Sequence, residues 1–231
     1  MQYKFKQLFG DEWYSLLQEY LHSPQFLQLG SNINNLRKNT VIHPSSDKVF
    51  RIFKELSYSN INIIILSMDP YNDGSACGRA FCNSESLKIS PSLKIIQKEI
   101  ELEYPETVDR FEMPYGGLDK ADLNYLIKQG VFLYNTSLTV EHKKPGSHTE
   151  LWREFTSKVI EVLNTKEILV WILMGKQAQS YLPLINSNHK TICCSHPASE
   201  AYKPDSGFFG SGIFRQCNFY LNENGRKEIE W

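Results

Sequence analysis

Three side chains with complementary chemistry follow short apolar runs in the sequence. Asp69 comes after the run 62–66, Asn135 after 131–134 and His196 after 191–194. A carboxylate can orient a water molecule, an amide can both donate and accept hydrogen bonds, and an imidazole can donate to a leaving group. One polar residue after a strand means little because loops are polar, but three that converge would form a catalytic set.

The apolar runs that must position these residues have the composition of buried strands, because they lack strict alternation of polar and apolar residues. They are Asn62–Leu66, Val131–Tyr134, Ile168–Leu173 and Thr191–Cys194. Helical patterns separate them: Ser90 and Pro91 open one over 92–102, and Ser147 with Glu150 fits a capping box before another. The alternation predicts an α/β fold with a short central parallel four-stranded sheet flanked by helices on both faces. In such sheets ligands bind beyond the carboxyl ends of the strands.

The composition is that of an ordinary globular protein. The 231 residues are 41% hydrophobic and 22% charged, which fits one domain spanning 1–231. The longest apolar runs are too short to cross a bilayer, and the first residues lack the pattern of a secretory signal. With a net charge of −1, any binding to nucleic acid must come from a local patch, or from backbone amides and helix N-termini.

The five cysteines are odd in number and contain no C-x-x-C pair, so we expect reduced thiols and no metal site. Neither a P-loop nor a GxGxxG motif occurs, and we expect no cofactor.

Several segments in order along the chain, from about residue 9 to the C-terminus, resemble the motifs of the classical uracil-DNA glycosylases. Ser-Met-Asp-Pro-Tyr-Asn at 67–72 resembles the family's water-activating Gly-Gln-Asp-Pro-Tyr-His. The remaining matches lie at 78–81, 90–93, 133–140, 147–148, 155–156, 196–199 and 207–210. Any one of these segments is a weak signal, but their order and the intact Asp-Pro-Tyr make the resemblance strong.

The resemblance implies a DNA-repair enzyme that flips uracil out of DNA and hydrolyses its N-glycosidic bond, leaving an abasic site. DNA, single-stranded and double-stranded, is then the partner, and a DNA-mimicking protein inhibitor is a further one. A monomer is implied, located in the cytoplasm or, in a eukaryote, the nucleus. Because the matched motifs contain no lysine that could attack the sugar, we expect a monofunctional hydrolase.

The resemblance also assigns roles to residues. Asp69 and His196 are the catalytic pair. Met68, Tyr71, Phe81 and Asn135 form the base pocket: the Asn135 amide matches uracil and not cytosine, Tyr71 excludes the methyl group of thymine, and Phe81 stacks on the base. The residues expected to contact DNA are Asn72, Ser92, Gly175, Lys176, Ser199, Glu200 and Tyr202.

The sequence departs from the family pattern mainly in the segments that handle DNA. The motif's closing histidine is Asn72, and the leucine that wedges into the DNA stack aligns with Glu200. A carboxylate cannot replace lost base stacking, so we expect Tyr202 to serve as a weaker wedge and the enzyme to favour single-stranded DNA. Two alternatives remain open: a glycosylase for another modified pyrimidine, and a non-catalytic relative that binds DNA or a partner.

Overall fold

The computed structural model describes residues 2–84, 89–107, 121–203 and 205–231. Its centre is a parallel four-stranded sheet in the order β3-β2-β5-β6. The strands are β2 (Ile63–Ser67), β3 (Val131–Asn135), β5 (Val170–Met174) and β6 (Lys190–Cys194). All four predicted strands are confirmed, with small shifts at their ends.

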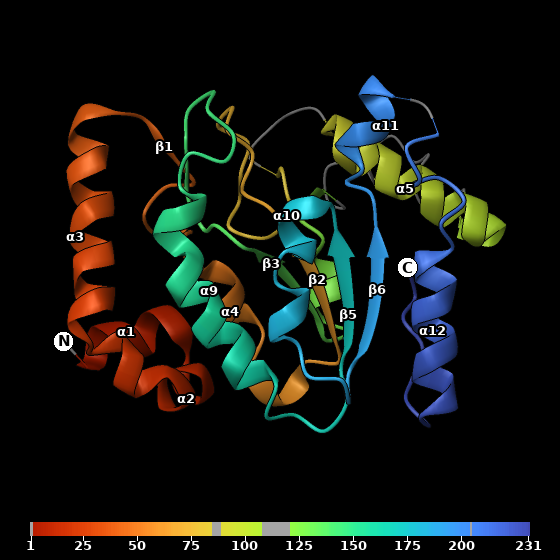
Figure 1. The fold of residues 1–231 in the computed structure, drawn as a ribbon, viewed down its shortest axis with the longest axis horizontal. Helices are drawn as coiled ribbons and strands as arrows, with labels where there is room; N and C mark the ends of the chain where they lie inside the picture. The colour runs from red at the N-terminus through yellow and green to blue at the C-terminus, as the bar shows by residue number, and fades with distance from the viewer. Residues whose placement is uncertain (1, 85–88, 108–120, 204) are drawn as a thin grey trace.

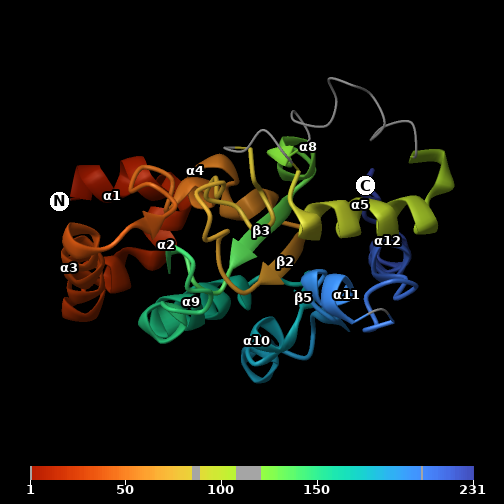
Figure 2. The same cartoon turned by 90° about the horizontal axis from the view of Figure 1, so that it is seen from above.

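Helices cover both faces of this sheet. Figures 1 and 2 show α9 and α10 on one face and α5 and α8 on the other, with α12 packed beside β6. The helices are α1 (Gln2–Phe9), α2 (Asp11–Leu21), α3 (Pro24–Asn39), α4 (Arg51–Glu55), α5 (Pro91–Glu103), α8 (Asn124–Ile127), α9 (Thr149–Leu163), α10 (Lys176–Gln179), α11 (Ala198–Tyr202) and α12 (Ile213–Glu223), with 3-10 turns η1 (Tyr58–Asn60), η2 (Pro105–Thr107) and η3 (Leu182–Leu184). A separate antiparallel pair, β1 (Ile42–His43) and β4 (Val140–Glu141), joins the N-terminal part of the chain to the loop before α9.

The two predicted helix starts have different outcomes. Ser90 caps α5 as expected, because its hydroxyl accepts a hydrogen bond of 3.1 Å from the Leu93 amide and Pro91 occupies the first turn. The capping box of Ser147 and Glu150 is wrong. The residue before α9 is His148, which makes no side-chain cap, and Ser147 instead accepts a hydrogen bond from the Glu141 amide.

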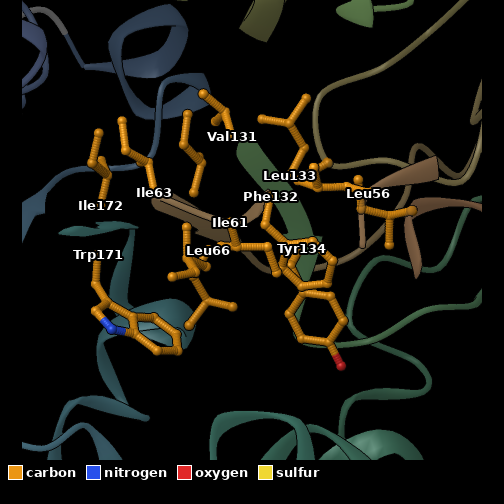
Figure 3. Packing of buried hydrophobic residues seen from close by; sticks show 14 of the residues in the cluster. Leu56, Ile61, Ile63, Leu66, Val131, Phe132, Leu133, Tyr134, Trp171 and Ile172 are labelled. Atoms are coloured by element: carbon orange, nitrogen blue, oxygen red, sulfur yellow. The ribbon is translucent and has the colours of Figure 1, made fainter. Parts of the chain in front are cut away.

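Side chains from both faces of the sheet enter one hydrophobic core. Figure 3 shows Val131 and Leu133 of β3 pointing to one side of the strand and Phe132 and Tyr134 pointing to the other. The ring of Trp13 stacks on Phe132 at 5.3 Å between ring centroids, so α2 is tied to the sheet. Because every residue of β2, β3 and β5 is buried, the strands fix the positions of the residues that follow them.

The expectation of reduced cysteines is wrong for one pair. Cys77 and Cys82 form a disulfide, with their Cα atoms 5.7 Å apart, and Gly78 between them has a positive φ of 92°. The other cysteines, 193, 194 and 217, are free thiols.

No helix in the described part of the chain combines the length and the apolarity that a bilayer crossing requires.

Candidate active site

A cavity of about 640 Å³ opens beyond the carboxyl ends of the parallel strands. Most of the predicted site residues line it: Met68, Asp69, Tyr71, Asn72, Phe81, Ser92, Gly175, Lys176, His196 and Tyr202. They come from the segments after β2, β5 and β6 and from the start of α5, so the sheet brings them together as the strand pattern predicts. Asn135, Ser199 and Glu200 are not part of the lining. The structure also contains a somewhat larger cavity, about 750 Å³, but it is lined by other residues and none of the predicted ones.

Asp69 is partly buried and is held by the main chain of a distant loop. Its Oδ2 accepts a hydrogen bond of 2.6 Å from the Gly146 amide. Burial raises the pKa of Asp69, and the Gly146 hydrogen bond lowers it, with a net upward shift. The carboxylate is therefore oriented, and its burial strengthens its electrostatic interaction with any positive charge that develops nearby.

The chain after β2 is fixed to the chain after β3 through Met68. The Met68 carbonyl accepts hydrogen bonds from the Ser137 amide at 2.9 Å and from the Thr136 hydroxyl at 2.8 Å. The Asn72 carbonyl accepts from the Lys143 amide at 3.0 Å. These contacts use main-chain atoms of the segment 67–72 and leave its side chains free to face the cavity.

Asn135 ends β3 directly opposite Ser67, which does line the cavity. Its side chain is only 4% exposed, and its carbonyl oxygen finds no hydrogen-bond partner among the described residues. An unsatisfied buried acceptor costs roughly 1–3 kcal/mol, which a donor on a bound molecule would recover. Asn135 thus lies behind the cavity wall, with its side-chain oxygen available as an acceptor. The sequence pattern did not predict that Ser67 forms the wall in front of it.

Two aromatic side chains shape the cavity. The Tyr71 hydroxyl forms a 2.5 Å hydrogen bond with the Ser90 hydroxyl, which fixes the ring relative to α5. Burial raises the pKa of Tyr71 to about 12, so the phenol is neutral. Phe81 is buried and has the left-handed backbone angle φ = 61°, a costly conformation that places its ring 5.7 Å from the His196 ring.

His196 follows β6 and is poised as a hydrogen-bond donor. Burial lowers the pKa of His196, which keeps the ring neutral near pH 7. The Ala198 amide donates to Nδ1 at 3.1 Å, so the single ring proton of the neutral form lies on Nε2. Gly175 packs directly against this residue: a Cβ atom added there would stand 2.9 Å from the His196 Cβ.

The residues expected to contact DNA differ in how exposed they are. Lys176 is exposed at the start of α10, and Tyr202 is 89% exposed at the end of α11; both lie on the cavity lining. Ser199 is half-buried on α11. The loop containing Tyr202 continues through Pro204, which lies outside the described residues.

Glu200, which we expected to contact DNA, has a buried side chain. Its side chain turns inward, is 8% exposed, and accepts hydrogen bonds from the Ser206 hydroxyl and the Phe208 amide, each at 2.8 Å. Burial alone would raise the pKa of Glu200, but these hydrogen bonds outweigh burial and lower it. The alignment of Glu200 with the family's leucine did not predict these hydrogen bonds, because Ser206 and Phe208 lie at a different matched segment of the sequence.

The sequence also gave no sign of Gly146. It lies one residue before the matched Ser147-His148, but its contribution is a main-chain N–H that no residue-type pattern records. The parts of the chain that the structure describes contain no group of three or more His, Cys, Asp or Glu side chains arranged to hold a metal ion.

Comparison with known proteins agrees with this geometry. Residues 53–222 match the Uracil DNA glycosylase superfamily. The chain is 37% identical over 223 residues to a uracil-DNA glycosylase of Idiomarina loihiensis, covering 95% of this chain and 99% of the relative. It is 36% identical to one from Amoebophilus asiaticus, with 95% and 96% covered. A mimivirus UNG variant solved in complex with UGI shares the fold at a TM-score of 0.84, with 23% identity over 98% of this chain and 90% of that one. The chain belongs to the uracil-DNA glycosylase superfamily.

Proposed function

We propose that this chain removes uracil from DNA by hydrolysing the N-glycosidic bond of a flipped-out nucleotide and leaves an abasic site. One observation carries the proposal: a single cavity at the strand ends contains the oriented Asp69 carboxylate, the buried Phe81 ring and a neutral His196 with its proton on Nε2. The identity to curated uracil-DNA glycosylases over nearly the whole chain supports it.

Cleavage of the bond leaves positive charge on the sugar and negative charge on the departing base, as in other glycoside hydrolyses. Asp69 stabilises the sugar cation and orients the water that attacks its anomeric carbon. His196 donates from Nε2 to the O2 atom of uracil and so stabilises the leaving anion, in the manner of an oxyanion hole. The proton that water loses goes to Asp69 or to solvent.

Selectivity for uracil depends on two side chains. Asn135 lies behind the cavity wall at Ser67, so a bound uracil must displace that wall to reach it. The unsatisfied side-chain oxygen then accepts from uracil N3–H and the side-chain amide group donates to O4, whereas cytosine presents the reverse pattern and leaves both groups unpaired. The Tyr71 ring, tethered to Ser90, stands where a 5-methyl group would project. This wall argues against the alternative of a bulkier modified pyrimidine.

The DNA backbone passes across the mouth of the cavity in this proposal. Lys176 is the exposed cation of the lining and binds phosphate, together with Asn72, Ser92, Gly175 and the nearby Ser199. Tyr202 inserts into the space that the flipped base leaves. A tyrosine on a five-residue helix is a weaker wedge than a leucine loop shaped for the purpose, so single-stranded DNA is the preferred substrate.

The enzyme works as a single-domain monomer on DNA inside the cell, without metal or cofactor. A protein inhibitor that mimics DNA would bind the same mouth; the mimivirus relative bound to UGI is a precedent for such a partner.

The test is release of free base from oligonucleotides that contain uracil, thymine or a 5-substituted uracil, each as single strand and as duplex. We expect release of uracil alone, faster from single strands. Release of a 5-substituted base at a comparable rate would favour the modified-pyrimidine alternative, and no release at all would favour the non-catalytic relative.

A further inference from the structure

The loop that follows His196 is closed by a buried carboxylate. Glu200 lies in the middle of α11, two residues before the exposed Tyr202. Its Oε1 accepts from the Ser206 hydroxyl and the Phe208 amide at 2.8 Å and from the Phe209 amide at 3.3 Å. One carboxylate therefore gathers donors from the chain on the far side of the loop.

That far side is immobilised by the core. Phe208 is fully buried, and the next residues are anchored to α5, where Glu99 accepts from the Gly210 and Gly212 amides at 2.9 and 3.2 Å. The Ser195 hydroxyl, just before His196, donates to the Ser206 carbonyl. Glu200 thus connects α11 to a rigid part of the molecule, while α11 itself has only five residues and little stability of its own.

The same helix carries groups at both ends that face the cavity. At its start, the Ala198 amide fixes the His196 ring, and at its end Tyr202 lies on the cavity lining. Ionised carboxylates form hydrogen bonds roughly twice as strong as neutral acceptors do. Removing this acceptor would release the C-terminal end of α11, where Tyr202 is exposed, more than the His196 end, which β6 anchors.

We propose that Glu200 is a positioning residue for base flipping: it holds α11 so that Tyr202 stands ready at the mouth of the cavity before DNA arrives. The inference rests on the proposed function, since it acts through the Tyr202 wedge. In this proposal Glu200, which aligns with the family's leucine wedge, does not act as the wedge itself but holds the helix that carries Tyr202.

The experiment compares steady-state kcat/KM for uracil release from a single-stranded oligonucleotide and from the matched duplex. The variants are Glu200→Gln, Tyr202→Ala and the double variant. Glu103→Gln is the control, because it removes a buried carboxylate that accepts from the Phe214 and Arg215 amides outside the loop. Hydrogen exchange of peptides covering 205–210 reports the loop without depending on activity.

We expect Glu200→Gln to lower the duplex-to-single-strand ratio of kcat/KM by about tenfold, because it replaces an ionised acceptor by a neutral one that forms weaker hydrogen bonds. Tyr202→Ala should lower the ratio similarly, and the double variant should lower it no further. Glu200→Gln should also speed hydrogen exchange over 205–210, whereas Glu103→Gln should reduce stability with the ratio unchanged.

The proposal is overturned if Glu200→Gln reduces activity equally on both substrates, if the effects of the two substitutions multiply, or if Tyr202→Ala leaves the ratio unchanged. Failure of the proposed function is a separate result: the parent protein would release no uracil from either substrate.

Discussion

The Gly146 amide donates a 2.6 Å hydrogen bond to the Asp69 carboxylate across 77 residues of sequence. The bond occupies one carboxylate oxygen and leaves the other available to a water molecule. Because the donor is a main-chain group on the loop between β4 and α9, the orientation of Asp69 depends on the path of that loop, which the β1–β4 pair in turn anchors.

Asp69→Asn should lower the rate of uracil release by about 10²–10⁴-fold, the usual cost of losing a positioned acid or base, with DNA binding nearly unchanged. Single-turnover rates and binding to an uncleavable oligonucleotide measure the two effects. Unchanged release would reduce Asp69 to a turn residue.

The same substitution should not reduce stability. Folding raises the pKa of Asp69 above its ordinary value of 3.8. The contribution of Asp69 to the free energy of unfolding therefore falls as the pH rises from 3.8 through the pKa of the folded state. Asp69→Asn removes this loss, so its thermal midpoint at pH 7 should equal or exceed that of the parent. The prediction is contradicted if the thermal midpoint of the variant minus that of the parent is smaller at pH 7 than at pH 4.

His196→Leu should slow bond cleavage by roughly 10²–10³-fold, as removal of one oxyanion-type donor does. Burial lowers the pKa of His196, so the unfolded chain binds a proton at this residue at a higher pH than the folded chain does. The parent therefore loses stability as the pH falls from the ordinary value of 6.5 toward the pKa of the folded state. The variant lacks that acid sensitivity. Thermal denaturation between pH 5 and pH 8 measures it, and parallel curves for parent and variant would show that His196 is not buried as a neutral ring.

Asn135→Asp should damage recognition of uracil more than it damages the fold. An ionised carboxylate cannot donate to O4, and a protonated one presents a different pattern in a site that is 4% exposed. We expect a large rise in KM for uracil-containing oligonucleotides. If kcat and KM both keep the parent values, Asn135 is only the end of β3.

Gly175→Ala tests the contact between α10 and His196. The new methyl group would stand 2.9 Å from the His196 Cβ, at a backbone angle of φ = 89° that side chains rarely adopt. Such backbone strain costs about 1–3 kcal/mol by itself, and displacement of the imidazole should add a drop in kcat. Gly210→Ala is the matched control, because it has a φ of 70° with open space around the added atom. It should lose stability but keep its kcat, and an equal drop in kcat for both variants would remove the contact from the mechanism.

The strand pattern predicted the sheet because Ile, Val and Leu runs that are buried on both faces have little freedom to be anything else. The positions of the candidate site residues Asp69 and His196 were predictable too, because the sheet sets where the strand ends lie. The hydrogen-bond partners of Glu200 and Ser147 were not predicted, for a common reason: each side chain accepts from main-chain amides that lie elsewhere in the fold, at Phe208 and Glu141. Residue types and spacing carry no record of such partners. The Cys77–Cys82 bond was missed because it depends on the turn at Gly78.

The hydrogen bonds to the Met68 carbonyl have a consequence for how this site can diverge. Both bonds, from Thr136 and Ser137, are made to an atom that every amino acid possesses. A methionine can therefore stand where the resembling motif has a glutamine, and the neighbouring Asp69 stays in register. A substitution at residue 68 would therefore change the cavity wall while both hydrogen bonds to the main chain beside Asp69 remain.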